Sequence, residues 1–237
     1  MKIALLGYGK MGKIIEKMAL ERGHEISFIA SSENKDFNAK ELEETDVAIE
    51  FSVPDSAIPN MHRCFMMDVP VVVGTTGWYD KFDKVNNCRL DQNGTLLHAT
   101  NFSVGVNIFY EINRKLAALM NNQKQYSVSV EEIHHTEKLD APSGTAISIA
   151  EGIIGEMDDK LSWINNSTSE SDKLPVISKR EPNVPGTHTV TYDSEIDFIE
   201  IKHEAKNRNG FALGAVLAAE FLKDKQGLFT MKDVLQF

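Results

Sequence analysis

The sequence predicts an α/β protein in which a doubly wound parallel sheet is joined to a second α+β domain with a mixed or antiparallel sheet. Two observations lead to this fold class. Up to residue 101, short apolar runs alternate with segments of helical periodicity, which is typical of a parallel sheet covered on both faces. Beyond that point, longer segments alternate apolar and polar residues, which indicates strands with one solvated face.

The first domain is predicted from its short apolar strands and the amphipathic segments between them. Strands are expected at residues 3–6, 25–30, 47–51, 69–73 and 95–99. Helices are expected at residues 11–22, 56–67 and 80–87. Because strands and helices alternate along the chain, the strands are expected to run parallel.

The second domain is predicted to begin after residue 102. Helices are expected at residues 106–121, 145–154, 212–222 and 230–235, and strands at 126–133, 187–193 and 198–203. The polar stretch 162–173 is interpreted as a loop. The last helices are expected to return to the first domain. The dinucleotide-binding domain is therefore 1–102 with 212–237, and the domain for substrate binding and oligomerisation is 103–211.

Composition and charge exclude several classes of partner. The net charge is −10, and a phosphate backbone binds basic surfaces, so nucleic acid is not expected as a partner. No apolar run approaches the length of about 18 residues that suggests a membrane span. Cys64 and Cys88 form neither a CxxC pair nor a metal-ligand spacing, which is typical of reduced thiols. We therefore expect a cytoplasmic protein.

A glycine-rich turn lies between the first predicted strand and the first predicted helix. Its residues, which match GxGxxG, are Gly7, Tyr8, Gly9, Lys10, Met11 and Gly12. The first glycine of such a turn allows the bend, the second lets a pyrophosphate approach, and the third allows close helix–strand packing. The helix start offers N–H groups to phosphates. In this context the pattern predicts a Rossmann-type domain that binds a dinucleotide.

The residues after the second predicted strand bear on the choice of dinucleotide. NAD-binding domains carry an acidic residue about twenty residues beyond the glycine turn. Here the strand end carries Ser31 and Ser32, and Glu33 follows. The two hydroxyls with Lys35 or Lys10 could accept a 2′-phosphate, whereas Glu33 could hold a ribose hydroxyl. NADPH and NADH both stay open as the cofactor, with a slight preference for NADPH.

A second group of reactive residues follows the strand predicted at 126–133. His134, His135 and Lys138 lie within five residues. A helix then opens at a run of three small residues, which are Ser143, Gly144 and Thr145. The free N–H groups and hydroxyls of such a helix start form an anion site, and the neighbouring cations strengthen it. The segment therefore predicts a binding site for a carboxylate.

Metal binding is not predicted from this segment. A zinc site would need a third ligand at suitable spacing, and none follows the histidine pair. The other histidines are interpreted as structural residues; they are His24, His62, His98, His188 and His203.

The most specific pattern in the chain is the run EEIHHTEKLDAPSGTA at residues 131–146. Supporting segments are EFSVP at 50–54, GTTGW at 74–78, ATNFSVGVN at 99–107, NRNGFALGAV at 207–216 and GLFTMKDVL at 227–235. Over nearly its whole length the chain thereby resembles the 4-hydroxy-tetrahydrodipicolinate reductases, also called dihydrodipicolinate reductases. The run at 131–146 resembles that family's signature E-x-H-H-x-x-K-x-D-A-P-S-G-T-A.

The resemblance implies roles for particular residues. It implies that His134 is the general acid/base and that Lys138 is a second catalytic donor. It implies a substrate-binding group that consists of His135, Ser143, Gly144 and Thr145. The cofactor would be lined by the glycine turn at residues 7–12 and by Phe51, Gly74, Thr75, Thr76, Ala99, Thr100, Asn101 and Phe102.

The activity implied by the resemblance is NADPH- or NADH-dependent reduction of a small dicarboxylate, 4-hydroxy-tetrahydrodipicolinate, to tetrahydrodipicolinate in lysine and diaminopimelate biosynthesis. It also implies a homo-oligomer, a tetramer, formed through the second sheet, and the open edges of such a sheet favour the same conclusion. Two alternatives remain. One is another Rossmann-type dehydrogenase that acts on an amino acid or a semialdehyde, and the other is a non-catalytic dinucleotide sensor.

Overall fold

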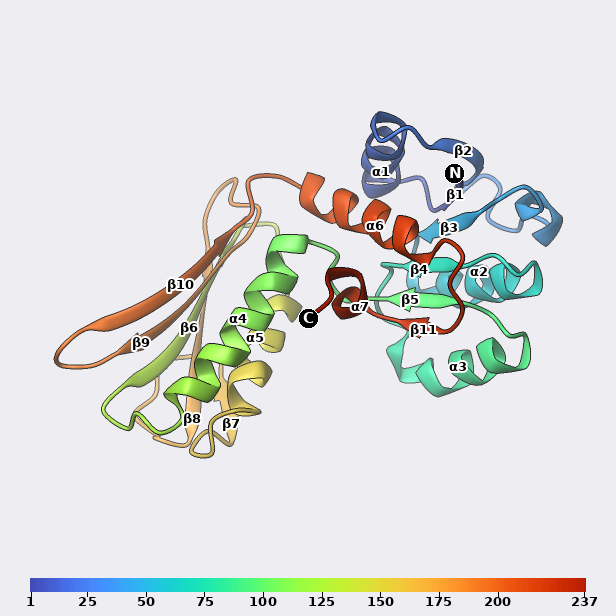
Figure 1. Cartoon of the computed structure of the whole chain (residues 1–237). Helices are drawn as coiled ribbons and strands as arrows, with labels where there is room; N and C mark the ends of the chain where they lie inside the picture. The colour runs from blue at the N-terminus through green and yellow to red at the C-terminus, as the bar shows by residue number, and fades with distance from the viewer. The chain divides into compact units, whose positions relative to one another are not determined.

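The structure is a computed structural model that describes all 237 residues, and it divides into two compact units. Unit 1 comprises Met1–Val104 with Asn209–Phe237, and unit 2 comprises Gly105–Arg208. Both units are drawn in Figure 1. The nucleotide- and substrate-binding roles expected for the two parts of the chain remain predictions at this point. None of the helices combines the length and the hydropathy that a membrane span requires.

Unit 1 contains a six-stranded sheet whose strands all pair in parallel, in the order β11-β5-β4-β3-β1-β2. The strands are β1 (Lys2–Leu6), β2 (Glu25–Ala30), β3 (Val47–Glu50), β4 (Val71–Val73), β5 (Leu96–His98) and β11 (Leu228–Phe229). The first five confirm the predicted strands. Every residue of β3 and β4 is buried, because helices cover both faces of the sheet.

Each face of this sheet has its own core. Successive residues of β1 point to opposite faces, so Ile3 and Leu5 pack into one core, and Ala4 and Leu6 pack into the other. Figure 1 shows α1 and α6 on one face, with α2 and α3 on the other. The helices are α1 (Lys10–Glu21), α2 (Pro54–Met66), α3 (Phe82–Asp91), α6 (Asn209–Leu222) and α7 (Met231–Leu235), with 3₁₀ turns η1 (Ala39–Leu42) and η2 (Tyr79–Lys81).

Unit 2 contains a five-stranded mixed sheet in the order β10-β9-β6-β8-β7. The central strand β6 pairs in parallel with β8 and antiparallel with β9. The strands are β6 (Ser127–His134), β7 (Ser162–Ile164), β8 (Lys173–Arg180), β9 (Thr187–Asp193) and β10 (Phe198–Glu204). Helices α4 (Val104–Met120) and α5 (Gly144–Ile154) cover one face, as Figure 1 shows.

Two strands of unit 2 correct the sequence-based prediction. The stretch 162–173, expected as a loop, begins with β7, and β8 was not predicted at all. β8 contains Pro175 and several charged residues, which are local signals against a strand in the middle of a sheet. Pairing with β6 on one side and β7 on the other outweighs these signals. The fold class itself, with a parallel and a mixed sheet, is confirmed.

The carboxyl end of β3 carries a completely buried carboxyl group. Glu50 is 0% exposed and forms no salt bridge, and its Oε1 accepts hydrogen bonds from the Ser52 hydroxyl and from Nδ2 of Asn60. Burial raises the pKa of Glu50, and hydrogen bonds from Ser52 and Thr75 offset this only in part. Burial therefore favours the protonated form of Glu50, whose contacts join the end of β3 to α2 and to the end of β4.

Close packing of α6 generates a stability prediction. A Cβ at Gly214 would lie 1.7 Å from the carbonyl oxygen of Phe102, whereas a Cβ at Gly210 meets nothing closer than 3.5 Å. We expect Gly214→Ala to lower the free energy of unfolding by about 1–3 kcal/mol through overpacking. Gly210→Ala, in the same helix, should be neutral or slightly stabilising. Thermal denaturation of both variants measures the difference, and equal melting temperatures would contradict the close approach.

Glu50 generates a pH prediction. The pKa of Glu50 is higher in the folded than in the unfolded protein, where it is near 4.5. Its contribution to the free energy of unfolding is therefore complete below pH 4.5, and it is lost as the pH rises through the pKa of the folded protein. Glu50→Gln does not titrate, so its stability relative to the native protein should increase as pH rises above 4.5. Urea unfolding across that pH range tests this. The exposed Glu43→Gln is the control and should show no such trend. A flat difference for Glu50→Gln would mean that this carboxyl ionises without cost.

Candidate active site

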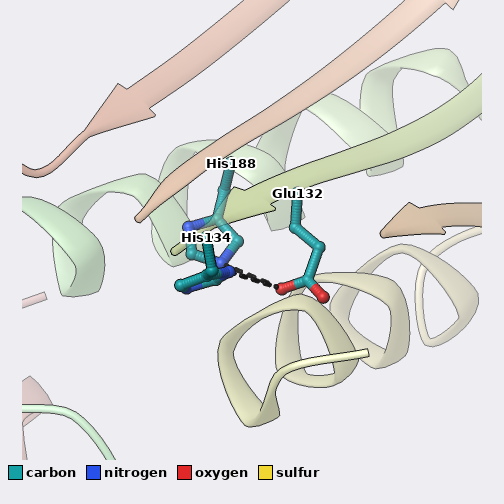
Figure 2. Close-up of side chains that lie close together, drawn as sticks. All are labelled: Glu132, His134 and His188. Carbon is teal, nitrogen blue, oxygen red and sulfur yellow. Dashed lines mark ion pairs between the residues drawn. The ribbon is translucent and has the colours of Figure 1, made fainter. Parts of the chain in front are cut away.

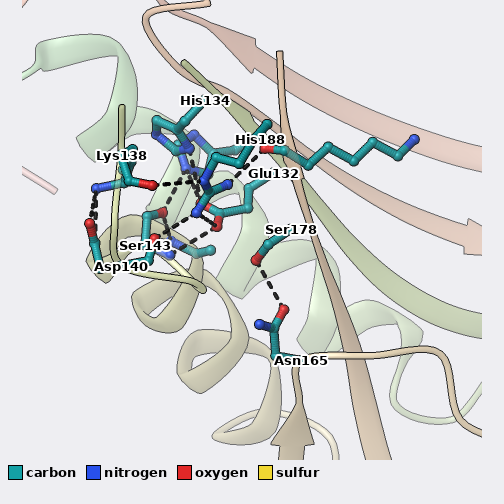
Figure 3. Close-up of polar contacts among 11 residues, drawn as sticks. Glu132, His134, Lys138, Asp140, Ser143, Asn165, Ser178 and His188 are labelled. Atoms are coloured by element: carbon teal, nitrogen blue, oxygen red, sulfur yellow. Dashed lines mark hydrogen bonds and ion pairs between the residues drawn. The ribbon is translucent and has the colours of Figure 1, made fainter. Parts of the chain in front are cut away.

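The helix-covered face of the unit 2 sheet changes from apolar to polar toward the end of β6. Two valines of β6 point into the core, and Glu132 and His134 follow on the same face because side chains alternate along a strand. The strand register places Ser178 of β8 and His188 of β9 opposite Glu132. It also places Arg180 of β8 opposite His134. Three strands therefore bring one polar cluster together (Figure 2, Figure 3).

Glu132 lies at the centre of this cluster and is 0% exposed. Its Oε2 lies 3.1 Å from Nδ1 of His134 and 3.8 Å from Nε2 of His188. Its Oε1 accepts a hydrogen bond of 3.0 Å from the backbone N–H of Ser143, and Nη2 of Arg180 lies 3.3 Å away. Figure 3 shows Glu132, His134 and His188 grouped beside Ser143 at the start of α5. All four neighbours offer nitrogen atoms, which suits an ionised carboxylate.

The charge states within the cluster follow from burial and from these contacts. Burial alone would favour a neutral Glu132, but contacts with His134 and Ser143 hold the pKa of its carboxyl well below the usual range. Burial lowers the pKa of His188 to about 4, and the nearby His134 contributes in the same direction. His188 is therefore neutral near pH 7, and its Nε2 lies 3.3 Å from the Ser143 hydroxyl.

Ser143 is the N-cap of α5. Its backbone is extended, and its hydroxyl accepts a hydrogen bond of 3.1 Å from the backbone N–H of Ala146. The Ser143 hydroxyl thus satisfies one N–H group of the first turn. The backbone N–H of Ser143 in turn donates to the carboxylate of Glu132. The helix starts at Gly144, which is exposed and has no heavy atom within 4 Å of the position that a Cβ would occupy. The start of α5 is accordingly open to an anion.

The loop between β6 and α5 carries Lys138. Its Nζ lies 2.8 Å from both carboxylate oxygens of Asp140. Arg180 ties this loop to β8, because its Nε donates to the carbonyl oxygen of Lys138 and its Nη2 donates to that of Asp140. The Asp140 side chain is 59% exposed, so another carboxylate can compete for the lysine. His135 is half-buried, and its Nδ1 has no hydrogen-bond partner.

Sequence reasoning missed three members of the cluster. Glu132 shares a strand face with His134, which is a two-residue periodicity visible in the sequence. Arg180 lies on the strand that was not predicted, and His188, interpreted as a structural residue, lies directly in the cluster. The sequence analysis found no third possible metal ligand near the histidine pair, and the structure corrects this. Ligand atoms of Glu132, His134 and His188 lie within 4.8 Å of one another, although Arg180 already supplies a cation to the carboxylate.

In unit 1 the glycine turn borders a cavity of about 330 Å³. Gly7 has φ +109°, and a Cβ there would lie 2.2 Å from the carbonyl oxygen of Phe51. A Cβ at Gly12 would lie 2.3 Å from the carbonyl oxygen of Gly7, whereas Gly9 faces open space. No side chain caps the start of α1. Open space at Gly9 and uncapped N–H groups fit a phosphate group.

The cavity wall contains some of the predicted cofactor residues. These are Gly7, Tyr8, Gly9, Ser31, Ser32 and Phe51, and Lys35 joins them. Lys10, Met11 and Gly12 form the first turn of α1. Residues 74–76 and 99–102 do not line this cavity, although the Phe51 ring contacts Gly74 closely and stacks at a tilt on Phe102, with centroids 5.5 Å apart. No acidic side chain lines the cavity.

Comparison with known proteins gives consistent matches over the whole chain. Residues 1–102 match the family model for the N-terminus of dihydrodipicolinate reductase, and residues 105–235 match the model for its C-terminus. The 4-hydroxy-tetrahydrodipicolinate reductase of Christiangramia forsetii is 53% identical over 99% of this chain and 98% of its own. That of Thermosipho africanus is 32% identical over 100% of this chain and 98% of its own.

Solved structures agree at the level of the fold. A dipicolinate-bound dihydrodipicolinate reductase from Paenisporosarcina sp. TG-14 has a TM-score of 0.80 at 21% identity and covers 98% of both chains. An amine dehydrogenase from Mycobacterium smegmatis has a TM-score of 0.62 at 10% identity, over 98% of this chain and 95% of its own. Since two family models together match nearly every residue, this chain belongs to the dihydrodipicolinate reductase family.

Proposed function

We propose that this protein reduces 4-hydroxy-tetrahydrodipicolinate to tetrahydrodipicolinate with NADPH or NADH, as a step of lysine and diaminopimelate biosynthesis. The observation that carries the proposal is the arrangement of residues 131–146. There a histidine contacts a buried carboxylate whose other oxygen holds the open start of α5. A proton donor beside an anion site is what reduction of a cyclic dicarboxylate requires. A relative with 53% identity carries this enzyme's name.

The proposed roles divide between proton transfer and substrate binding. His134 is the general acid, because its ring nitrogen can carry and release a proton. Lys138 is the second donor, and a substrate carboxylate replaces the exposed Asp140 as its partner. The start of α5 binds a carboxylate through Gly144 and Thr145 together with His135. Ser143, the third residue expected to bind the substrate, is 2% exposed and its N–H and hydroxyl are already hydrogen-bonded, so it shapes the helix start instead.

The chemistry needs one hydride and one proton, and the ring loses one water. When bound, the reduced nicotinamide supplies the hydride to an unsaturated carbon of the substrate ring. His134 supplies the proton from its ring nitrogen. Lys138 and the start of α5 orient the two carboxylates, so that the same ring atoms are presented in every turnover.

NADPH is the proposed cofactor, held by unit 1. The cavity beside the glycine turn includes Ser31, Ser32 and Lys35 but no acidic side chain that would accept a ribose 2′-hydroxyl. Glu33, the candidate for that contact, is not part of the cavity wall. A cation and two hydroxyls suit a 2′-phosphate. Residues 74–76 and 99–102, at the carboxyl ends of β4 and β5, are proposed to hold the remainder of the dinucleotide.

A cytoplasmic location is proposed together with this activity. Both cysteines are free thiols, and Cys64 is buried in the core of unit 1. Unpaired thiols suit a reducing compartment.

A coupled assay tests the proposed function. The product of the preceding synthase reaction is supplied as the substrate, and consumption of NADPH and of NADH is followed by absorbance. We expect turnover with this substrate and a higher kcat/KM with NADPH. Turnover only with amino acids or semialdehydes would favour a different dehydrogenase. Binding of either nucleotide without turnover of any of these substrates would favour a dinucleotide sensor.

The two proposed donors should differ in their kinetic losses. His134→Gln should lower kcat by about 10²–10⁴-fold with little change in substrate KM, because the acid acts mainly in the transition state. Lys138→Met should lower kcat and also raise KM, since it removes a charge beside a dicarboxylate. Steady-state kinetics measure both, with exposed His62→Gln and Lys124→Met as controls. Near-full turnover of His134→Gln would exclude His134 as the acid.

A homo-oligomer, a tetramer formed through the unit 2 sheet, is also proposed. Strand β10 is an edge strand on which Phe198 is 65% exposed and Ile199 is 39% exposed. Light scattering at micromolar concentration should give a mass well above the 26.5 kDa of one chain, and Phe198→Asp should reduce it. Leu119→Asp, on α4 rather than on the sheet edge, should leave the mass unchanged. A monomeric native protein would exclude the proposal.

A further inference from the structure

The polar cluster of unit 2 contains a buried charge to which the proposed reaction assigns no role. Glu132 is 0% exposed and ionised, and its desolvation is costly unless donors surround it. Its oxygen Oε2 and Nδ1 of His134 are both buried, and the structure gives neither atom a hydrogen bond, so their contact is an ion pair. At 3.1 Å these two atoms can therefore satisfy each other. Figure 2 shows the carboxylate directed at the imidazole.

This contact has a consequence for the proton on His134. A nitrogen that faces a carboxylate must carry hydrogen, so Nδ1 is the protonated position next to Glu132. Nε2 is then the nitrogen left to exchange a proton with a substrate. A Cβ at Gly186 would lie 3.0 Å from Nε2, so the glycine there leaves room around that nitrogen.

The other oxygen of Glu132 has a separate task. Oε1 accepts the backbone N–H of Ser143 at 3.0 Å, directly before the first residue of α5. The carboxylate of Glu132 thus contacts His134 through Oε2 and the residue before α5 through Oε1. Arg180, 3.3 Å from Oε1, balances the charge and also binds the backbone of the Lys138 loop.

We infer that Glu132 is a positioning residue for the reduction: it fixes the ring and tautomer of His134 and sets this ring relative to the start of α5. The inference rests on the proposed function. Glu132 is not a catalytic residue, since it acts through His134. A carboxylate that orients an imidazole in this way recurs in acid/base sites on unrelated folds.

Replacement of Glu132 by glutamine separates orientation from binding. The glutamine carbonyl can still accept the N–H of Ser143, but its NH₂ group turns toward Nδ1 of His134, where a donor now meets a donor. We expect Glu132→Gln to lower kcat by about 10–100-fold while substrate KM changes by less than about threefold. The matched control is Glu131→Gln, the neighbouring residue on the opposite face, which pairs with Lys179 at 2.6 Å. It should keep native kcat and KM.

Nitrogen NMR of protein labelled with ¹⁵N-histidine measures the tautomer independently of activity. The His134 resonances are assigned by their loss in His134→Gln. In the native protein we expect Nδ1 of His134 to be protonated, and in Glu132→Gln we expect that preference to be lost. A neutral native His134 with its proton on Nε2 would overturn the inference, even if Glu132→Gln fails to fold. So would a Glu132→Gln variant whose kcat stays within about twofold of the native value.

The two measurements distinguish this inference from the proposed function. If the native protein does not reduce the substrate, but Nδ1 is protonated and responds to Glu132→Gln, then the positioning stands and the assigned reaction fails. If the native protein is active and Glu132→Gln is equally active, the reaction stands and the positioning role fails.

Discussion

The buried negative charge of Glu132 is the constraint that determines how the polar cluster of unit 2 is arranged. An ionised carboxylate in a protein core is costly to desolvate, so it persists only where several donors converge on it. Here the nearby nitrogen atoms belong to β6, β8 and the residue that precedes α5, and Nε2 of His188 on β9 lies 3.8 Å away. Satisfying one charge therefore brings four elements to the same point. The proposed acid His134 and the helix start at Ser143 are neighbours as a result.

Glu50 in unit 1 shows the opposite solution to the same problem. It is equally buried at the end of a central strand, but its neighbours are hydroxyl and amide groups, and no cation is paired with it. Burial therefore raises the pKa of Glu50, whereas contacts with His134 and Ser143 lower the pKa of Glu132. The polar partners, rather than the degree of burial, decide whether such a carboxyl is ionised.

Prediction from the sequence succeeded where the signal is local. Five of the six strands of unit 1 and its helices follow from hydrophobic periodicity, whereas the short strand β11 was not predicted. The glycine turn follows from steric needs that only glycine meets, as the close approach of Gly7 to Phe51 illustrates. Within the site, His134 and Ser143 could be found because they stand within one short segment before a helix. Strand β8 could not be found, because its proline and charges contradict its place between β6 and β7.

The sequence by itself determined the two kinds of sheet, the glycine turn, the anion-binding helix start and the family signature at residues 131–146. Each of these depends on residues that are close together along the chain. Only the tertiary structure decided that His188 and Arg180 join Glu132 and His134. The physical reason is strand register: β6, β8 and β9 pair residues that are distant in sequence, and long-range pairing leaves no periodic trace in any one segment. The charge on Glu132 could be assigned only once those partners were known.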